Sequence, residues 1–510
     1  MFSLIQSCGY HGIDGYVMEI ETDAGGGIPT FDIVGLGDTA VREAKERVRS
    51  AIKNSGFDFP ARHIIINLAP ADIRKEGATY DLPIAIGVMC AFGMISQDFC
   101  SKEYMFAGEL SLDGNIRPVK GVLPMLICAI ENGVKNFFIP QGNSNEALVA
   151  DKLNIYPVSR LEEVADHLNG VKQIPKREGK QPLWKDAAGH GMDFQEVRGQ
   201  FQGKRALEIA AAGAHNCLMV GSPGTGKTML AERLVTILPD MTFEESLQVT
   251  KIYSIAGLLD DTFPFVSQRP FRSPHHTSTV TSIAGGGRNP KPGEISLAHM
   301  GVLFFDEAPE FRKEALEVLR QPIEKGEITL SRLHASITYP SKAMIVMAAN
   351  PCKCGRLFEE DGQCSCTPSE IRGYFGRISK PLLDRIEIQV KVQSLPYKEL
   401  TEPELDGECS AVIRERVNAA RNVQVERYRH IGVFSNSELS GALTKKHCVL
   451  TKEAEDLLKT AYTKMRFSAR TYSKVLKVSR TIADLEGADK IESTHVAEAI
   501  QYKGVEQWLK

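Results

Sequence analysis

Residues 217–228 read CLMVGSPGTGKT, and the stretch MLAERLVTIL follows at once. The first four residues are an apolar run that predicts a buried strand, and the residues after Thr228 are typical of a helix. Between the two lies the pattern G-x4-G-K-T, in the strand, loop and helix context that it requires. From Phe194 to about Val392, strand and helix patterns alternate. This alternation predicts an α/β domain with a mostly parallel sheet.

The residue types of this loop are those that bind nucleotide phosphates. Glycines let backbone N–H groups wrap a phosphate at the start of a helix. Lys227 supplies a positive charge to the β- and γ-phosphates, and the hydroxyl of Thr228 reaches Mg²⁺. We therefore predict ATP and Mg²⁺ as ligands. The predicted nucleotide-binding residues are Gly221, Ser222, Pro223, Gly224, Thr225, Gly226, Lys227 and Thr228.

Two further apolar runs end in polar residues. VLFF at 302–305 is followed by Asp306 and Glu307. Downstream of a phosphate-binding loop, Asp306 is predicted to hold Mg²⁺ and Glu307 to polarise the attacking water. AMIVMAA at 343–349 is followed by Asn350, which either orients that water or caps a turn. We favour the first role because the two preceding motifs assemble one site.

Two arginines lie in positions where they would stabilise the charge of a transition state. Arg385 stands at a predicted helix-to-strand junction, and Arg470 opens a predicted helix near the C-terminus. We expect one to reach the γ-phosphate of a neighbouring subunit and the other to act on its own chain. Each residue by itself is also compatible with a surface salt bridge.

Four cysteines are clustered in a C-x-C-x9-C-x-C pattern. They are Cys352, Cys354, Cys364 and Cys366. Four thiolates at this spacing suit tetrahedral Zn²⁺, and a site with four protein ligands is structural because no position is left for water. The alternatives are free thiols or a regulatory redox pair.

Two segments are candidates for contact with nucleic acid. Residues 326–339 alternate apolar and polar side chains around Arg332 and His334, which predicts a hairpin whose tip either follows DNA phosphates or is an ordinary surface turn. The loop 272–291 contains basic residues and no acid, which is typical of a second DNA-contacting loop. Its candidate residues are Arg272, Arg288 and Lys291.

The composition is that of a globular protein with several domains. The 510 residues carry a net charge of −3, so any nucleic-acid contact must come from a local patch. No signal peptide and no apolar run long enough for a membrane span is expected, and the scattered cysteines suit the reducing cytoplasm. The predicted ranges are 1–168 for a mixed α+β domain, 169–193 for a linker, 194–395 for the α/β core with the cysteine insertion 352–366, and 396–510 for a helical end.

Some individual elements are also predicted. Residues 39–54 have an apolar stripe typical of an amphipathic helix (Val41, Ala44, Val48, Ala51 and Ile52), and residues 81–95 read as an apolar helix. The Asp-Gly pair at 113–114 indicates a hairpin within 106–118. Ser493 or Thr494 is expected to cap the final helix.

The order of motifs resembles a known family. The loop, VLFFDE, MAANPC, PLLDRIE and SAR together resemble the Mg-chelatase-like branch of AAA+ ATPases, and RSPHHTSTVTSIAGGGRNPKPGEISLAHMGVLFFDE is similar to the YifB/ComM family. This resemblance implies a hexameric ATPase ring in which Asn350 is sensor 1, Arg385 the trans finger and Arg470 sensor 2. It also implies a DNA helicase that drives branch migration in natural transformation, on single-stranded or branched DNA. Lys353, Lys380 and Glu387 depart from the family pattern without touching a predicted catalytic residue.

The first 168 residues resemble the S5-like fold shared with Lon proteases. A Lon protease needs a serine nucleophile and a lysine base. Ile84 stands at the nucleophile position and Leu123 at the lysine position, so we predict no peptidase activity. This domain is expected to bind DNA or to assist ring assembly. The rival functions are a chelatase-like motor that remodels a protein partner and a degenerate Lon-like ATP-dependent protease.

Overall fold

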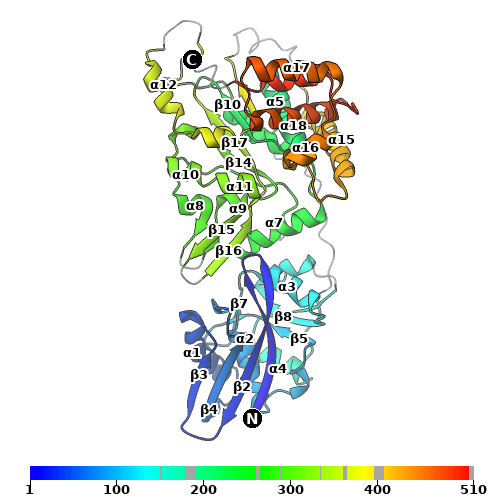
Figure 1. The fold of residues 1–510 in the computed structure, drawn as a ribbon. Coiled ribbons are helices and arrows are strands. Elements are labelled where there is room, and N and C mark those ends of the chain that lie inside the picture. Colours follow the sequence, from blue (N-terminus) through cyan, green and yellow to red (C-terminus); the bar gives the residue numbers. More distant parts are fainter. Residues whose placement is uncertain are drawn as a thin grey trace. The chain divides into compact units, whose positions relative to one another are not determined.

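The computed structural model describes residues 1–149, 152–177, 191–259, 265–287, 290–332, 335–359, 364–394 and 407–504. The chain divides into two compact units (Figure 1). Unit 1 comprises Met1–Lys185 and Ser246–Ser267, and unit 2 comprises Asp186–Glu245 and Gln268–Lys510. Most of the predicted linker and the predicted boundary at 395/396 lie outside the described residues.

Unit 1 is built on one mixed sheet, drawn in blue and cyan in Figure 1. Its strand order is β3-β4-β2-β1-β5-β8-β9. β1 and β2 form a long antiparallel hairpin, whereas β5, β8 and β9 are parallel to one another. The strands are β1 (Phe2–His11), β2 (Asp14–Gly25), β3 (Thr30–Val34), β4 (His63–Ala69), β5 (Tyr104–Phe106), β8 (Asn136–Pro140) and β9 (Asn154–Val158).

The helices of unit 1 follow the apolar periodicity of the sequence. The predicted helix α1 (Thr39–Asn54) is confirmed, and its buried residues are the five of its apolar stripe. Asp38 caps it by accepting a hydrogen bond from the backbone of Val41 at 2.9 Å. The helix expected over 81–95 is shorter, because the chain leaves it before Gly93 in the left-handed region. The others are α2 (Asp81–Ala91), α3 (Val122–Glu131) and α4 (Leu161–Leu168), and the predicted hairpin is β6 (Glu109–Leu110) with β7 (Ile116–Arg117).

The central sheet of unit 2 is parallel throughout, as predicted. Its strand order is β11-β14-β17-β10-β18. Parallel pairing brings the carboxyl ends of β14, β17 and β10 to one edge, and a polar loop follows each of them. The strands are β10 (Cys217–Val220), β11 (Phe271–Arg272), β14 (Val302–Phe305), β17 (Met344–Ala349) and β18 (Ile388–Lys391).

The helical end of the chain shares one hydrophobic core with this sheet. Cys217 of β10, Val417 of α15 and Leu476 of α18 belong to the same buried cluster. The long α5 (Phe201–Gly213) contacts both β10 and the helical end. The helices of this end are α15 (Ser410–Tyr428), α16 (Gly441–His447), α17 (Lys452–Lys464), α18 (Ala469–Leu485) and α19 (Ser493–Gln501). Glu492 is the N-cap of α19, rather than the predicted Ser493 or Thr494.

Shorter elements lie between the strands of unit 2. They are α6 (Lys227–Arg233), α8 (Val280–Ala284), β12 (Gly285–Gly286), β13 (Lys291–Pro292), α9 (Glu294–Leu297), α10 (Lys313–Glu317), α11 (Arg320–Lys325), β15 (Glu327–Arg332), β16 (Ala335–Pro340), α12 (Pro368–Phe375) and α13 (Lys380–Leu383). The helix α7 (Phe243–Ala256) belongs to unit 1 from Ser246 onward. The predicted hairpin at 326–339 is confirmed as β15 paired with β16. The segment expected to be one loop at 272–291 instead contains α8 and the β12–β13 pair.

Candidate active site

The loop after β10 has the backbone that phosphate binding requires. Gly224 and Gly226 adopt φ angles of 78° and 85°, a left-handed conformation that favours glycine. α6 begins at Lys227, directly after this turn. The loop therefore ends at a helix N-terminus, where free backbone N–H groups and the helix dipole attract an anion.

Lys227 is held over the loop by three acceptors. Its Nζ donates to the carbonyl oxygens of Gly221 at 2.7 Å and Ser222 at 2.8 Å, and to Oδ1 of Asn350 at 3.2 Å. Burial lowers the pKa of Lys227, and the nearby carboxylates of Asp306 and Glu307 oppose that shift. The ammonium group is thus placed among oxygen atoms that a phosphate would replace.

Two hard oxygen ligands for Mg²⁺ lie together at the same edge. The hydroxyl of Thr228 donates to Oδ2 of Asp306 at 2.8 Å. Mg²⁺ prefers a hydroxyl and a carboxylate together with phosphate oxygens, so this pair fits the predicted metal. Glu307 follows with a φ angle of 49°, and its backbone N–H donates to Oδ1 of Asp306 at 2.9 Å. A non-glycine residue in this region is strained, and such strain gathers at functional sites.

One residue of this site was missed by the sequence analysis. Gln200 has a φ angle of 53°, and its side-chain amide donates to the carbonyl oxygens of Thr225 at 3.0 Å and Gln393 at 2.7 Å. It therefore ties the phosphate-binding loop to the segment after β18. Its sequence signal is only a Gly-Gln pair before a helix, which does not reveal a contact made 25 residues away.

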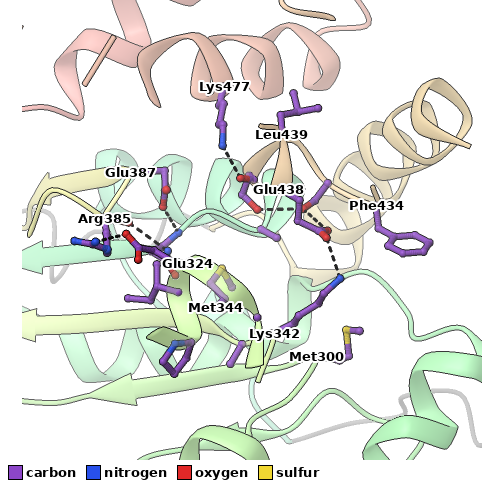
Figure 2. A pocket seen from close by; sticks show the side chains of 18 of the residues that line it. Met300, Glu324, Lys342, Met344, Arg385, Glu387, Phe434, Glu438, Leu439 and Lys477 are labelled. Carbon is purple, nitrogen blue, oxygen red and sulfur yellow. Dashed lines mark hydrogen bonds and ion pairs between the residues drawn. The ribbon is translucent and has the colours of Figure 1, made fainter. Parts of the chain in front are cut away.

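Arg385 lies at the other edge of the sheet, next to the amino end of β18. Its guanidinium contacts the carboxylate of Glu324 (Figure 2). It also donates to the carbonyl oxygen of Pro381. The side chain is 11% exposed, and its Nε has no hydrogen-bond partner among the described residues. It lines a cavity of about 690 Å³ that also contacts Asn216 and Met344, which stand before or at the start of strands.

Arg470 lines the same cavity as Arg385. The cavity is bounded by the amino ends of the strands, whereas Lys227 and Asp306 follow carboxyl ends. The roles of the two arginines at a nucleotide stay predictions, and both residues line the cavity at the edge of the sheet opposite the phosphate-binding loop.

Comparison with known proteins covers the whole chain. Residues 193–400 match the family described as magnesium chelatase, subunit ChlI; residues 20–143 match subunit ChlI of Mg-chelatase; and residues 407–503 match the C-terminal part of that subunit. Competence protein ComM of Haemophilus influenzae is 40% identical over 512 residues, covering 100% of this chain and 98% of the relative. The chain belongs to the YifB/ComM family of Mg-chelatase-like AAA+ ATPases.

Other relatives support this assignment. The uncharacterised protein YifB of Salmonella typhimurium is 41% identical over 98% of this chain and 96% of its own length. Lon protease of Rhizobium meliloti is 26% identical over 168 residues, covering 31% of this chain and 20% of the protease. The fold prediction, with a Lon-like N-terminal part, a parallel-sheet ATPase core and a helical end, is confirmed.

The cysteine cluster of this YifB/ComM family member is assembled in space. All four sulfur atoms lie within 4.8 Å of one another. The sulfur atom of Cys352 lies 3.3 Å from that of Cys354 and 3.7 Å from that of Cys364. The sulfur atoms of Cys354 and Cys364 are 3.6 Å apart. A metal at about 2.3 Å from four tetrahedral sulfurs implies separations of about 3.8 Å. The geometry therefore suits zinc and is far from the sulfur–sulfur bond length of about 2.05 Å in a disulfide.

The predicted DNA-contacting residues have different surroundings. Arg272 forms two hydrogen bonds with the carboxylate of Glu294, at 2.7 and 2.9 Å, so its charge is neutralised within the chain and it is a weaker DNA candidate than expected. Lys291 is exposed on β13. Arg332 is the last residue of β15, paired with Ala335. His334 and Arg288 lie outside the described residues.

Unit 1 buries the two positions that correspond to the catalytic serine and lysine of a Lon protease. Ile84 on α2 and Leu123 on α3 are almost fully buried, and neither offers a nucleophile or a base. Asp81, at the start of α2, is held by Nε of Arg47 at 2.6 Å. This region is therefore a packed core. Within the described ranges, no helix combines the length and the apolar character needed to cross a bilayer.

Proposed function

We propose that this chain is an ATP-driven DNA translocase that works as a homohexameric ring in the cytoplasm and promotes branch migration of recombination intermediates. The observation that carries the proposal is the division of the catalytic groups between two edges of one sheet. Lys227, Asp306 and Glu307 lie at the carboxyl edge, and Arg385 and Arg470 line a cavity at the amino edge. A head-to-tail contact between copies would bring the two edges together.

The chemistry at the carboxyl edge follows from the hydrogen bonds. On ATP binding, Lys227 exchanges its carbonyl acceptors for the β- and γ-phosphates. Thr228 and Asp306 would hold Mg²⁺, whose charge would offset that of the phosphates. Glu307 accepts a proton from the attacking water, and the Asn350 amide, already within 3.2 Å of Lys227, orients that water.

The arginines complete this site from a neighbouring copy. The buried Nε of Arg385 has no partner among the described residues, and a phosphate oxygen would satisfy this donor. In the isolated chain Glu324 holds this guanidinium, so assembly exchanges one anion for another. Arg470 would approach the same nucleotide, because it lines the same cavity. Hydrolysis is then coupled to the arrangement of adjacent subunits.

DNA contact is assigned to the β15–β16 hairpin. Arg332 is the last residue of β15, next to the turn of this hairpin, and the exposed Lys291 lies on β13. Phosphate contacts of this kind do not depend on sequence, as translocation requires. A relative that matches this chain over its full length carries the name competence protein, which fits a role in handling DNA.

Zinc is proposed as a structural cofactor at Cys352, Cys354, Cys364 and Cys366. The backbone N–H of Arg356 lowers the pKa of Cys354 to about 6, which favours the thiolate form that zinc binds. With four protein ligands, the metal has no open position for catalysis.

A second candidate function is the remodelling of a protein partner. The observation that favours it is the match of three segments of the chain to a subunit of magnesium chelatase. The two functions share the nucleotide site and differ in the substrate that the ring moves.

The deciding experiment is branch migration on a synthetic three-strand junction. Wild-type protein is compared with Lys227→Ala, which keeps the fold and removes the phosphate-binding charge. We expect ATP-dependent migration by the wild type and none by the variant. Robust ATPase activity without movement of the junction would refute the DNA proposal and favour protein remodelling.

A further inference from the structure

The cysteine cluster is built onto the segment that follows the sensor strand. Asn350 follows β17 at the nucleotide site, and Cys352 comes two residues later. Cys352 is fully buried, whereas Cys354 is exposed. The first cysteine pair is therefore joined to the catalytic edge by only one intervening residue, Pro351.

The turn that directly follows Cys354 packs on the phosphate-binding loop. Gly355 has a φ angle of 80°, and a Cβ added to it would lie 2.5 Å from Cδ and 2.7 Å from Cγ of Pro223. These distances are far below van der Waals contact, so the backbone of Gly355 touches the proline ring. Pro223 lies between Ser222 and Gly224, inside the loop that wraps the phosphates.

A second contact attaches the cysteine segment to β18, the strand next to β10. The ammonium group of Lys391 lies 4.2 Å from the centre of the Phe358 ring, a cation–π contact. Lys391 ends β18 and is in register with Val220, the residue before the phosphate-binding loop. The cysteine segment thus has two points of attachment at the carboxyl edge, one on the loop and one on the adjacent strand.

We propose that the metal held by Cys352, Cys354, Cys364 and Cys366 supports the phosphate-binding loop, so that nucleotide affinity depends on zinc occupancy. Of the described residues between 351 and 366, only Pro351, Cys352 and Gly355 are buried, so we assign to the metal the cross-linking that an apolar core would otherwise provide. Loss of the ion frees Gly355 to move away from Pro223, and the loop then samples conformations that do not bind phosphate. This inference rests on the proposed ATPase function and adds its dependence on zinc.

The expected defect is in binding rather than in chemistry. Lys227 and Thr228 begin α6, and Asp306 and Glu307 follow β14; the cysteine segment forms neither element. Removing zinc therefore leaves the catalytic groups in place and lowers the fraction of chains with a competent loop. The apparent dissociation constant rises as that fraction falls.

The test measures zinc content and affinity for a fluorescent ATP analogue on the full-length chain. We expect one zinc per chain in the wild type. Cys354→Ser should lose the metal and bind the analogue roughly tenfold more weakly or worse. The matched control is Cys409→Ser, because Cys409 is a thiol outside the cluster at the start of α15. The control should keep both the zinc and the affinity.

Two further measurements separate this effect from misfolding. A zinc-selective chelator, applied to wild-type protein in excess Mg²⁺, should weaken binding, and added Zn²⁺ should restore it. Gly355→Ala keeps all four thiols, so zinc should remain while the added methyl group presses on Pro223 and weakens binding by roughly tenfold.

The inference is overturned if the wild type contains no zinc. It is also overturned if zinc-free protein binds the analogue as tightly as the wild type, or if Gly355→Ala keeps both zinc and full affinity. A wild type that holds zinc but binds no nucleotide would instead contradict the proposed ATPase function. The failures of the two proposals are therefore distinguishable.

Discussion

Arg385 offers the sharpest test of the divided catalytic site. Cys217, the first residue of β10, pairs with Ile388, the first residue of β18. Arg385 lies three residues before Ile388 in the chain. The phosphate-binding loop begins after the four residues of β10, which span about 13 Å at about 3.3 Å per residue. The guanidinium also points to Glu324 at the amino edge (Figure 2). We therefore expect it to serve the nucleotide of a neighbouring copy rather than that of its own chain.

Arg385→Ala should lower kcat of ATP hydrolysis by about 10³-fold or more, the range in which such arginines act. Affinity for ATP should change little, because Lys227 and its neighbours are untouched. Stability should fall only slightly, because the partner Glu324 is 53% exposed and regains water. Arg414→Ala is the matched control: Arg414 has only a loose ion pair with Asp240, at 3.8 Å, and its loss should leave kcat unchanged.

Mixing two inactive variants decides whether the arginine acts between subunits. Lys227→Ala keeps Arg385, and Arg385→Ala keeps Lys227. In randomly mixed rings about a quarter of the interfaces join an intact loop to an intact arginine, so steady-state ATPase activity should reappear. Persistent inactivity of the mixture, while each variant still assembles, would refute action between subunits.

The remaining predictions concern other parts of the chain. Asn350→Ala should lower kcat about 10²-fold with little change in KM, measured by steady-state ATPase, because the amide orients water; a change in KM alone would contradict this role. Asp81→Ala should reduce the free energy of unfolding by about 3 kcal/mol in urea titration, because it leaves Arg47 partly buried and unpaired. Glu103→Ala, which breaks an exposed pair with Lys135, should change it by less than about 1 kcal/mol, and equal losses would refute the argument. Arg332→Ala should weaken binding to single-stranded DNA and make it less salt-dependent while basal ATPase is kept, and an unchanged salt dependence would exclude this residue as a phosphate contact.

The features that the sequence predicted are those encoded locally. A strand, a glycine-rich loop and a helix stand next to one another in the chain, so the loop at 221–228 and its lysine could be identified directly. The apolar stripe of α1 likewise matched its buried face residue by residue. Parallel pairing then explains why Asp306 and Asn350, far apart in sequence, lie with that loop.

The features that the sequence did not reveal depend on contacts between distant residues. Arg272 is neutralised by Glu294, a partner just outside the loop that was considered. Gln200 acts through backbone carbonyls, which have no sequence signature. Residues 246–267 belong to unit 1 although they lie between motifs of the nucleotide site. In each case the sequence shows the residues, whereas the tertiary fold determines which other residues they contact.

The central claim, that ATP hydrolysis by this chain is coupled to DNA, is tested most directly by steady-state ATPase measured with and without single-stranded DNA. The account predicts that DNA raises the rate for the wild type and that Arg332→Ala reduces this stimulation while basal activity is kept. An ATPase rate that is indifferent to DNA at low and at physiological salt would contradict the account and leave a protein-remodelling motor as the better explanation.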